Sequence, residues 1–180
     1  MLFFILISLV ILQRLAEVVI AKRNEKRMLQ QGAYEVGASH YPVMVAMHVS
    51  FFISLILEVL IFDRAISPLF SAFLIGFIIV QLLRIWCLAS LGSFWNTKII
   101  ILPGANVVKR GPYSFIRHPN YVVVCLEIIL LPLMFQAYIT AITFTLLNIA
   151  MLSVRIPTEE KALREATNYE DKFKKKISAS

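Results

Sequence analysis

Long apolar runs are the feature of this sequence that most restricts its fold. Crossing a membrane takes about 20 mainly apolar residues in one helix. The runs at 2–21, 41–62 and 68–91 meet that length, and a fourth run extends over 121–154. The chain is 59% hydrophobic and only 16% charged, whereas soluble domains are about 25% charged. We therefore predict a single all-α integral membrane domain covering residues 1–180.

The fourth run is too long for one span. As a single helix it would measure about 51 Å at 1.5 Å per residue, against a hydrocarbon core of about 30 Å. Pro132 and Gln136 lie near its middle, and a proline removes one helical hydrogen bond. We expect a tight hairpin of two helices at about 120–135 and 137–155, which gives five spans and a tail at 156–180.

The basic residues indicate how these spans are oriented. Fifteen of the eighteen lie in the segments 22–40 and 92–119 and in the tail from Arg155 onward, while the opposite side keeps only Arg64. By the positive-inside rule, the N-terminus is expected outside the cell membrane and the C-terminus in the cytoplasm. The same rule accounts for the net charge of +7 without a nucleic-acid partner. The apolar start lacks a basic region and a small-residue cleavage site, so we expect a retained first span.

The tail has the pattern of an amphipathic helix. Residues 157–160 are Pro-Thr-Glu-Glu, and acids suit a helix N-terminus. Apolar residues then recur at helical spacing over 162–169. The lysines within 172–176 favour attraction to anionic lipid.

Charged residues inside predicted spans are expensive and therefore informative. Arg14 and Glu17 are three residues apart and can pair on one helix face. Glu127 is expected either to pair with Arg84 or to line a polar cavity. Glu58 lies near the outer end of the second span and is interpreted as interfacial.

Histidine and cysteine spacing predicts no metal site. His40 and His48 are eight residues apart and can share a helix face, but no third ligand completes a set. An interfacial or substrate-facing role is favoured for both. Cys87 and Cys125 lie inside apolar runs and are interpreted as buried thiols.

The segment 111–121 contains the most information about chemistry. Its Gly-Pro pair gives a turn, and Pro119 suits the first position of a helix. His118 would then flank free backbone N–H groups that could bind an anionic group such as a carboxylate. The alternative is a membrane-entry turn in which Arg117 and Tyr121 are interfacial anchors.

A second informative segment covers 155–160. Arg155 and Glu159 are four residues apart where the last span meets the tail. A cation there could hold an anionic substrate, and the carboxylate could face a cationic or hydroxyl-bearing cofactor. The alternative is an interfacial salt bridge beside a helix N-terminus.

These motifs resemble the isoprenylcysteine carboxyl methyltransferase family. The matching residues are Gly-Pro-Tyr at 111–113, Arg-His-Pro-Asn-Tyr at 117–121, and the arginine, glutamate pair and leucine within 155–163. The resemblance is continuous over about 91–169. The segment 25–48 is similar to bacterial members, some of which methylate hydroxyls of alkylpyrone-type polyketide lipids.

The resemblance implies an S-adenosylmethionine-dependent methyltransferase that acts on a hydroxyl or carboxylate of a lipophilic substrate at the cytoplasmic membrane face. It implies that Arg155 binds the methyl acceptor and that Glu159 has both a catalytic and a cofactor-binding role. It implies no metal. By position, the family's cofactor contacts fall on Ala105, Val107, Val108, Tyr113, His118, Pro119, Asn120, Tyr121 and Glu159. Two departures stand out: Ala105 replaces a histidine of eukaryotic members, and Thr167-Asn168 replaces the usual Phe-Gly.

Other functions stay open at this point. Membrane reductases of the sterol-reductase type carry a similar Arg-His-Pro-Asn-Tyr segment and bind NADPH, but no additional basic phosphate site is visible here. A small transporter would require more polar residues at mid-bilayer. If the acceptor is a weakly acidic hydroxyl, Glu127 or a glutamate of the tail is a hypothetical base. The acceptor and the oligomeric state do not follow from the sequence.

Overall fold

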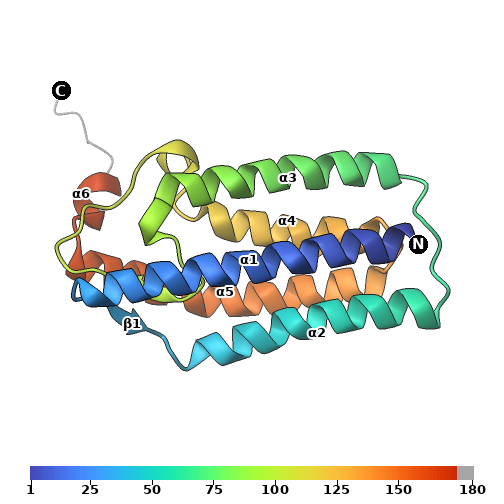
Figure 1. Ribbon diagram of the computed structural model, residues 1–180, viewed down its shortest axis with the longest axis horizontal. Helices are drawn as coiled ribbons and strands as arrows, with labels where there is room; N and C mark the ends of the chain where they lie inside the picture. Colours follow the sequence, from blue (N-terminus) through green and yellow to red (C-terminus); the bar gives the residue numbers. More distant parts are fainter. Residues whose placement is uncertain (174–180) are drawn as a thin grey trace.

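The computed structural model describes residues 1–173, and its helices run side by side along the long axis of the molecule (Figure 1). The main helices are α1 (Leu2–Gln30), α2 (His40–Ile61), α3 (Phe70–Leu91), α4 (Pro119–Leu133) and α5 (Tyr138–Ala166). The remaining elements are the strands β1 (Tyr34–Val36) and β2 (Ile99–Ile101), the short turns η1 (Gly92–Phe94) and η2 (Gly111–Ser114), and α6 (Tyr169–Phe173). Within the described residues, four helices are long and apolar enough to cross a membrane, and α4 is a shorter apolar helix. The predicted all-α membrane bundle is confirmed.

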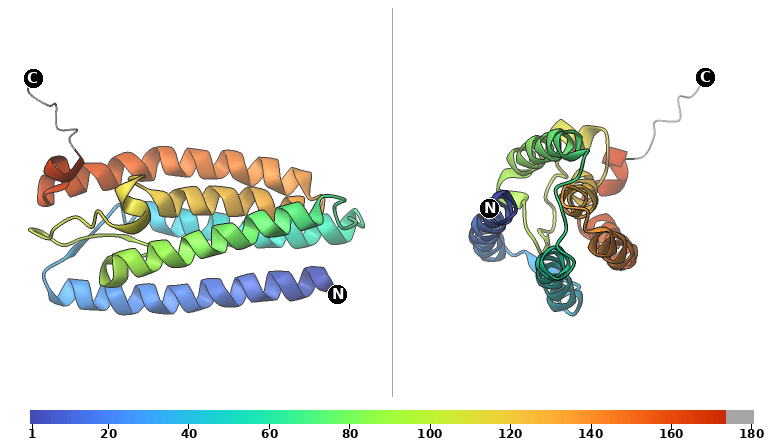
Figure 2. Two further views of the ribbon diagram at one scale, coloured as in Figure 1. Left: turned by 90° about the horizontal axis from the view of Figure 1, so that it is seen from above. Right: turned by 90° about the vertical axis from the view of Figure 1, so that its right-hand side faces the viewer.

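The two ends of the bundle differ. One end carries β1, the segment that follows α3, and α6, and we call it the loop end (Figure 1). The opposite end carries the N-terminus, the α2–α3 connection and the α4–α5 turn, and we call it the hairpin end. Seen along the bundle, α4 lies between α3 and α5, while α1 lies on the side away from α5 (Figure 2). The three segments richest in basic residues thus gather at the loop end.

The predicted α4–α5 hairpin is present and is anchored by the apolar core. Leu131, Met134 and Phe135 at this turn are almost fully buried, and the Phe135 ring meets that of Phe3 edge-on at 4.8 Å. Gln136 takes a positive φ of 53°, which reverses the chain between the two helices. The core therefore holds the hairpin end together, and the polar groups lie further toward the loop end.

Helix α1 is longer than the predicted span 2–21. Its buried face continues through Ala21, Asn24 and Met28. The Asn24 amide donates to the backbone carbonyl of Trp95 at 2.8 Å, and Met28 packs in a small apolar cluster with Ala33 and Ile100. Tertiary contacts thus extend the helix about two turns past the apolar run.

The prediction that a separate tail helix begins near residue 157 is wrong. Helix α5 continues through Pro157 to Ala166, so Glu159 lies inside the helix and not at its N-terminus. Pro157 leaves one carbonyl without its helical partner, but the Thr158 hydroxyl donates to the Val154 carbonyl one residue further on at 2.7 Å. Ala162 also packs against β2. Of the predicted lysine cluster, residues 174–176 lie outside the described part of the chain.

A two-stranded antiparallel sheet at the loop end was not predicted. β1 pairs with β2 so that Glu35 faces Ile100, and Ile99 and Ile101 pack against Ala162 of α5. The sheet therefore links the segments after α1 and after α3 to the extended end of α5.

Glu58 has a structural role that the predicted interfacial position did not include. Glu58 is only 5% exposed. Its carboxylate accepts hydrogen bonds from the backbone N–H groups of Ile139 at 3.1 Å and Thr140 at 2.7 Å. Arg64 pairs with it at 3.2 Å. Glu58 therefore caps the N-terminus of α5, where a negative charge is favourable.

Candidate functional site

One cavity of about 730 Å³ begins at the loop end and continues between the helices into the apolar part of the bundle. Most of the predicted cofactor and catalytic residues line it. They are Ala105, Val107, Val108, Tyr113, His118, Asn120, Tyr121, Arg155 and Glu159. Pro119 is the exception, because it is fully buried in the first turn of α4 and does not line the cavity. Segments some 50 residues apart in the sequence thus meet around one space.

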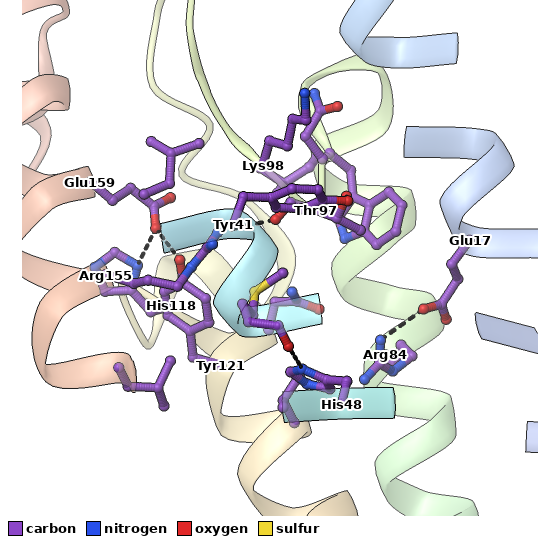
Figure 3. A pocket seen from close by; sticks show the side chains of 18 of the residues that line it. Glu17, Tyr41, His48, Arg84, Thr97, Lys98, His118, Tyr121, Arg155 and Glu159 are labelled. Carbon is purple, nitrogen blue, oxygen red and sulfur yellow. Dashed lines mark hydrogen bonds and ion pairs between the residues drawn. The ribbon is translucent and has the colours of Figure 1, made fainter. Parts of the chain in front are cut away.

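The start of α4 and the end of α5 meet at the mouth of the cavity (Figure 3). The Tyr121 hydroxyl donates to Oε2 of Glu159 at 2.6 Å, and Nδ1 of His118 lies 3.8 Å from the same oxygen. The His118 ring stacks on the Tyr121 ring with centroids 5.4 Å apart. These contacts fix one carboxylate oxygen of Glu159 at the edge of the cavity.

The neighbouring Glu160 has a different environment. Its carboxylate pairs with Nε2 of His118 at 3.2 Å, with Arg164 at 2.8 Å and with Arg117 at 3.5 Å. Glu160 does not line the cavity. The two adjacent acids therefore have different roles. Glu160 binds His118 on the side away from the cavity, and Glu159 faces the cavity.

Arg155 is the predicted acceptor-side cation and lies deeper than Glu159. It is only 4% exposed, and its Nη2 donates to the backbone carbonyl of Thr97 at 3.0 Å. Its Nε is buried without a hydrogen-bond partner, and the same holds for Oδ1 of Asn120. A buried polar group without a partner is costly, so these atoms are candidates to bind a ligand in the cavity.

Four charged residues from three helices meet further along the cavity, and we call them the ion cluster: Arg14, Glu17, Arg84 and Glu127. Arg14 pairs with Glu17 at 2.7 Å and with Glu127 at 2.8 Å. Arg84 pairs with Glu17 at 2.9 Å and also with Glu127. The predicted pairings Arg14–Glu17 and Arg84–Glu127 are confirmed. Two positive and two negative charges balance, which suits burial inside a membrane.

The segment after α3 supplies cavity residues that the sequence did not single out. Trp95, Thr97 and Lys98 all line the cavity. Hydrogen bonds from Lys98 to Glu25 and Glu35, at 2.8 and 2.9 Å, raise the pKa of the ammonium above its ordinary value. Lys98 therefore stays charged and ties this segment to the end of α1 and to β1. Only the folded arrangement shows this role, since no local motif marks it.

Asn168 gives a structural reason for one departure from the family pattern. Its side-chain oxygen accepts the Val107 backbone N–H at 2.8 Å, and its amide donates to the Asn106 side chain at 2.7 Å. It thereby secures the stretch 105–108 against the end of α5. The Val107 N–H is already used, so a ligand would have to contact other groups of this stretch.

Tyr113 also lines the cavity near Glu159. Burial, helped by the nearby Glu159, raises the pKa of its hydroxyl above the ordinary value. The hydroxyl therefore stays protonated at physiological pH and can donate a hydrogen bond.

Comparison with known proteins agrees with this site. The sequence model of the isoprenylcysteine carboxyl methyltransferase (ICMT) family matches residues 71–165. The chain is 48% identical over 163 residues to the uncharacterized protein YpbQ of Bacillus subtilis (strain 168), covering 91% of this chain and 97% of that protein. It is 28% identical over 145 residues to an uncharacterized protein of Haemophilus influenzae, covering 80% and 84%.

Proposed function

The chain belongs to the isoprenylcysteine carboxyl methyltransferase family and is a membrane methyltransferase, and from that premise we propose that it uses S-adenosylmethionine to methylate an oxygen of a lipophilic substrate. The acceptor class is a long-chain polyketide lipid such as an alkylpyrone. The observation that carries the proposal is the single cavity that joins His118, Tyr121 and Glu159 at the loop end to an apolar interior.

The cavity mouth fits the charges of the cofactor. S-adenosylmethionine supplies an activated methyl group on a positively charged sulfur and also carries an ammonium and a carboxylate. Glu159, held by Tyr121, would face the cationic groups. The first turn of α4 beside His118 would face the carboxylate, because helix N-termini favour anions. Oδ1 of Asn120 is a further buried acceptor without a partner.

Arg155 would hold the acceptor oxygen. Its guanidinium is fixed on one side by the Thr97 carbonyl, and its unpartnered Nε is free to donate. A rigid donor in a site closed to water stabilises a negatively charged or polarised oxygen at little reorganisation cost. Methyl transfer mainly requires that the two reactants are held in line, so Arg155 is proposed to orient the acceptor.

The acceptor lipid would enter from the membrane between α1 and α2. Apolar cavity residues from both helices, including Leu15, Val45, Val49 and Ile53, are also exposed on the outer surface of the bundle. An opening lined by exposed apolar side chains within a span suits a lipid chain. Given the charge distribution, the loop end is proposed to face the cytoplasm, where the soluble cofactor is present.

A ligand titration in detergent tests the function. Purified protein is heated with S-adenosylhomocysteine, with NADPH or with neither, and the unfolding temperature is measured. S-adenosylhomocysteine should stabilise the protein, because a ligand that binds the native state raises its stability. His118→Ala and Glu159→Ala should weaken this effect, whereas Arg155→Ala should mainly slow methyl transfer. Stabilisation by NADPH alone would instead identify a reductase.

A further inference from the structure

His48 of α2 lines the same cavity as the proposed cofactor and acceptor residues. Its Nδ1 lies 2.8 Å from the backbone carbonyl oxygen of Met44. A carbonyl oxygen can only accept, so this contact requires the hydrogen on Nδ1. The neutral ring then carries its lone pair on Nε2. No side chain or backbone group in residues 1–173 bonds to Nε2. This nitrogen can therefore accept a hydrogen bond from a ligand in the cavity.

The acids of the ion cluster are poor alternatives as proton acceptors. Glu17 accepts hydrogen bonds from Gln13, Arg14 and Arg84. Glu127 accepts from both arginines and from Gln81. These donors surround both carboxylates and bind their oxygens, which leaves little room for a substrate hydroxyl to approach. The hypothesis that Glu127 is the base therefore has little support.

The titratable side chains near the cavity mouth are also poor candidates for the proton acceptor. Nε2 of His118 faces Glu160, the pKa of Tyr113 is raised by burial, and Lys98 is held charged by two acids. No group among the described residues bonds to Oε1 of Glu159, but the proposed function assigns this carboxylate to the cationic groups of the cofactor. Among the described cavity residues, His48 best meets the requirements of a proton acceptor.

On the basis of the proposed methyl transfer, we infer that Nε2 of His48 takes the proton from the acceptor lipid, and that this lipid therefore presents a hydroxyl and not a carboxylate. As the new bond from oxygen to methyl carbon forms, the hydroxyl proton moves to Nε2. The bond from that carbon to sulfur breaks, and its electron pair stays on sulfur. The positive charge lost at sulfur reappears on the imidazole, so atoms and charge balance.

The surroundings of His48 suit a reversible proton acceptor. The charged groups that act on it are Arg14 of α1, Arg84 of α3 and Glu127 of α4. Figure 3 shows His48 between Tyr121 and Arg84 in that view, and the contact of its Nδ1 with the Met44 carbonyl oxygen holds the ring in place. The Glu127 carboxylate can offset the positive charge that the imidazolium carries once it has taken the proton.

An optical measurement tests proton acceptance without methyl transfer. A long-chain alkyl nitrophenol is added to the cofactor-free protein, and its absorbance reports the fraction present as phenolate. Wild type should raise that fraction near neutral pH, and His48→Gln and His48→Phe should lower it below the wild-type value, leaving only the part that Arg155 contributes. His40→Gln is the matched control, because His40 is on the same helix but does not line the cavity. Equal phenolate in wild type and both His48 variants would overturn the inference.

The pH dependence of methyl transfer gives a second test. With pentadecylresorcinol as acceptor, the wild-type rate should rise with pH as the imidazole loses its proton, and then level off. His48→Gln should lower the plateau about 100-fold, a typical contribution of a general base, and its rate should rise only as the acceptor itself ionises. The loss should be much smaller with the more acidic nitrophenol.

Two further outcomes separate this inference from the proposed function. If S-adenosylhomocysteine stabilises wild type and His48→Gln equally but the variant keeps the wild-type pH profile, the inference falls and the function stands. Preferred methylation of the carboxylate of N-acetyl-S-farnesylcysteine, unaffected by His48→Gln, would have the same meaning. Absence of any stabilisation by S-adenosylhomocysteine would overturn both.

Discussion

The Tyr121 hydroxyl donates to Oε2 of Glu159 at 2.6 Å and so joins the first turn of α4 to the loop end of α5. Tyr121→Phe removes this bond and leaves the carboxylate free to rotate. Hydrogen bonds to charged groups contribute about 1.5–3 kcal/mol, so affinity for S-adenosylhomocysteine should fall roughly tenfold to a hundredfold. Isothermal titration in detergent measures this. Tyr138→Phe, at the hairpin end, is the control and should bind like wild type.

Adjacent glutamates should behave differently when each loses its charge. Glu159→Gln should weaken cofactor binding at least tenfold and leave the unfolding temperature of the free protein nearly unchanged. Glu160→Gln removes the partner of His118, Arg164 and Arg117 and should lower that temperature. Its direct effect on binding should be small, because Glu160 does not line the cavity. The same loss of affinity in both variants would contradict this division.

Much of the bundle could be predicted because hydropathy is a local property. The α4–α5 hairpin could be predicted because one apolar run was too long for a single membrane span and contained Pro132. The continuation of α5 through Pro157 could not be predicted, because it depends on packing of Ala162 against β2, a contact between segments far apart in the sequence. The extension of α1 likewise depends on Asn24 bonding to a segment some 70 residues away.

The candidate site was predictable where its residues are contiguous. Residue order and spacing were enough to identify the motif around His118 and the pair Arg155 and Glu159. His48 was noticed only as one of two histidines, because its tautomer depends on a backbone carbonyl within the folded helix. Asn168 looked like a departure from the family, and its contact with Val107 becomes visible only in three dimensions.

Glu58 should contribute to stability as the cap of α5. Glu58→Gln keeps the shape but replaces one acceptor oxygen with a donor, so either Ile139 or Thr140 loses its partner. The expected cost is about 1–2 kcal/mol, typical for a lost cap. Thermal unfolding followed by circular dichroism measures it. Asp63→Asn is the control in the adjacent loop, where the side chain is exposed, and should be neutral.

Charge balance in the ion cluster should matter more than any one of its residues. Glu127→Gln leaves two guanidiniums facing only Glu17, and breaking a buried pair costs about 3–5 kcal/mol. Arg14→Gln combined with Glu127→Gln restores neutrality and should be more stable than Glu127→Gln alone. Unfolding by sodium dodecyl sulfate in mixed micelles compares the variants. Additive losses in the double variant would show that charge balance is not the cause.

Gly111 should be intolerant of any side chain for two separable reasons. Its φ is +57°, and a Cβ there would lie 2.2 Å from Oγ of Ser90 and 2.9 Å from Nε1 of Trp86. Gly104 also has a positive φ, +73°, but nothing lies within 4 Å of its Cβ position. Both alanine variants should lose about 1–2 kcal/mol from the left-handed backbone.

Gly111→Ala must also push the turn η2 away from α3, which adds about 1–3 kcal/mol of overpacking. Tyr113 lies two residues further on and lines the cavity. Gly111→Ala should therefore also weaken binding of S-adenosylhomocysteine, while Gly104→Ala should affect stability alone. Unfolding temperature and titration on the same samples separate the two effects. Equal stability of the variants would mean that η2 can move away from Ser90 without cost.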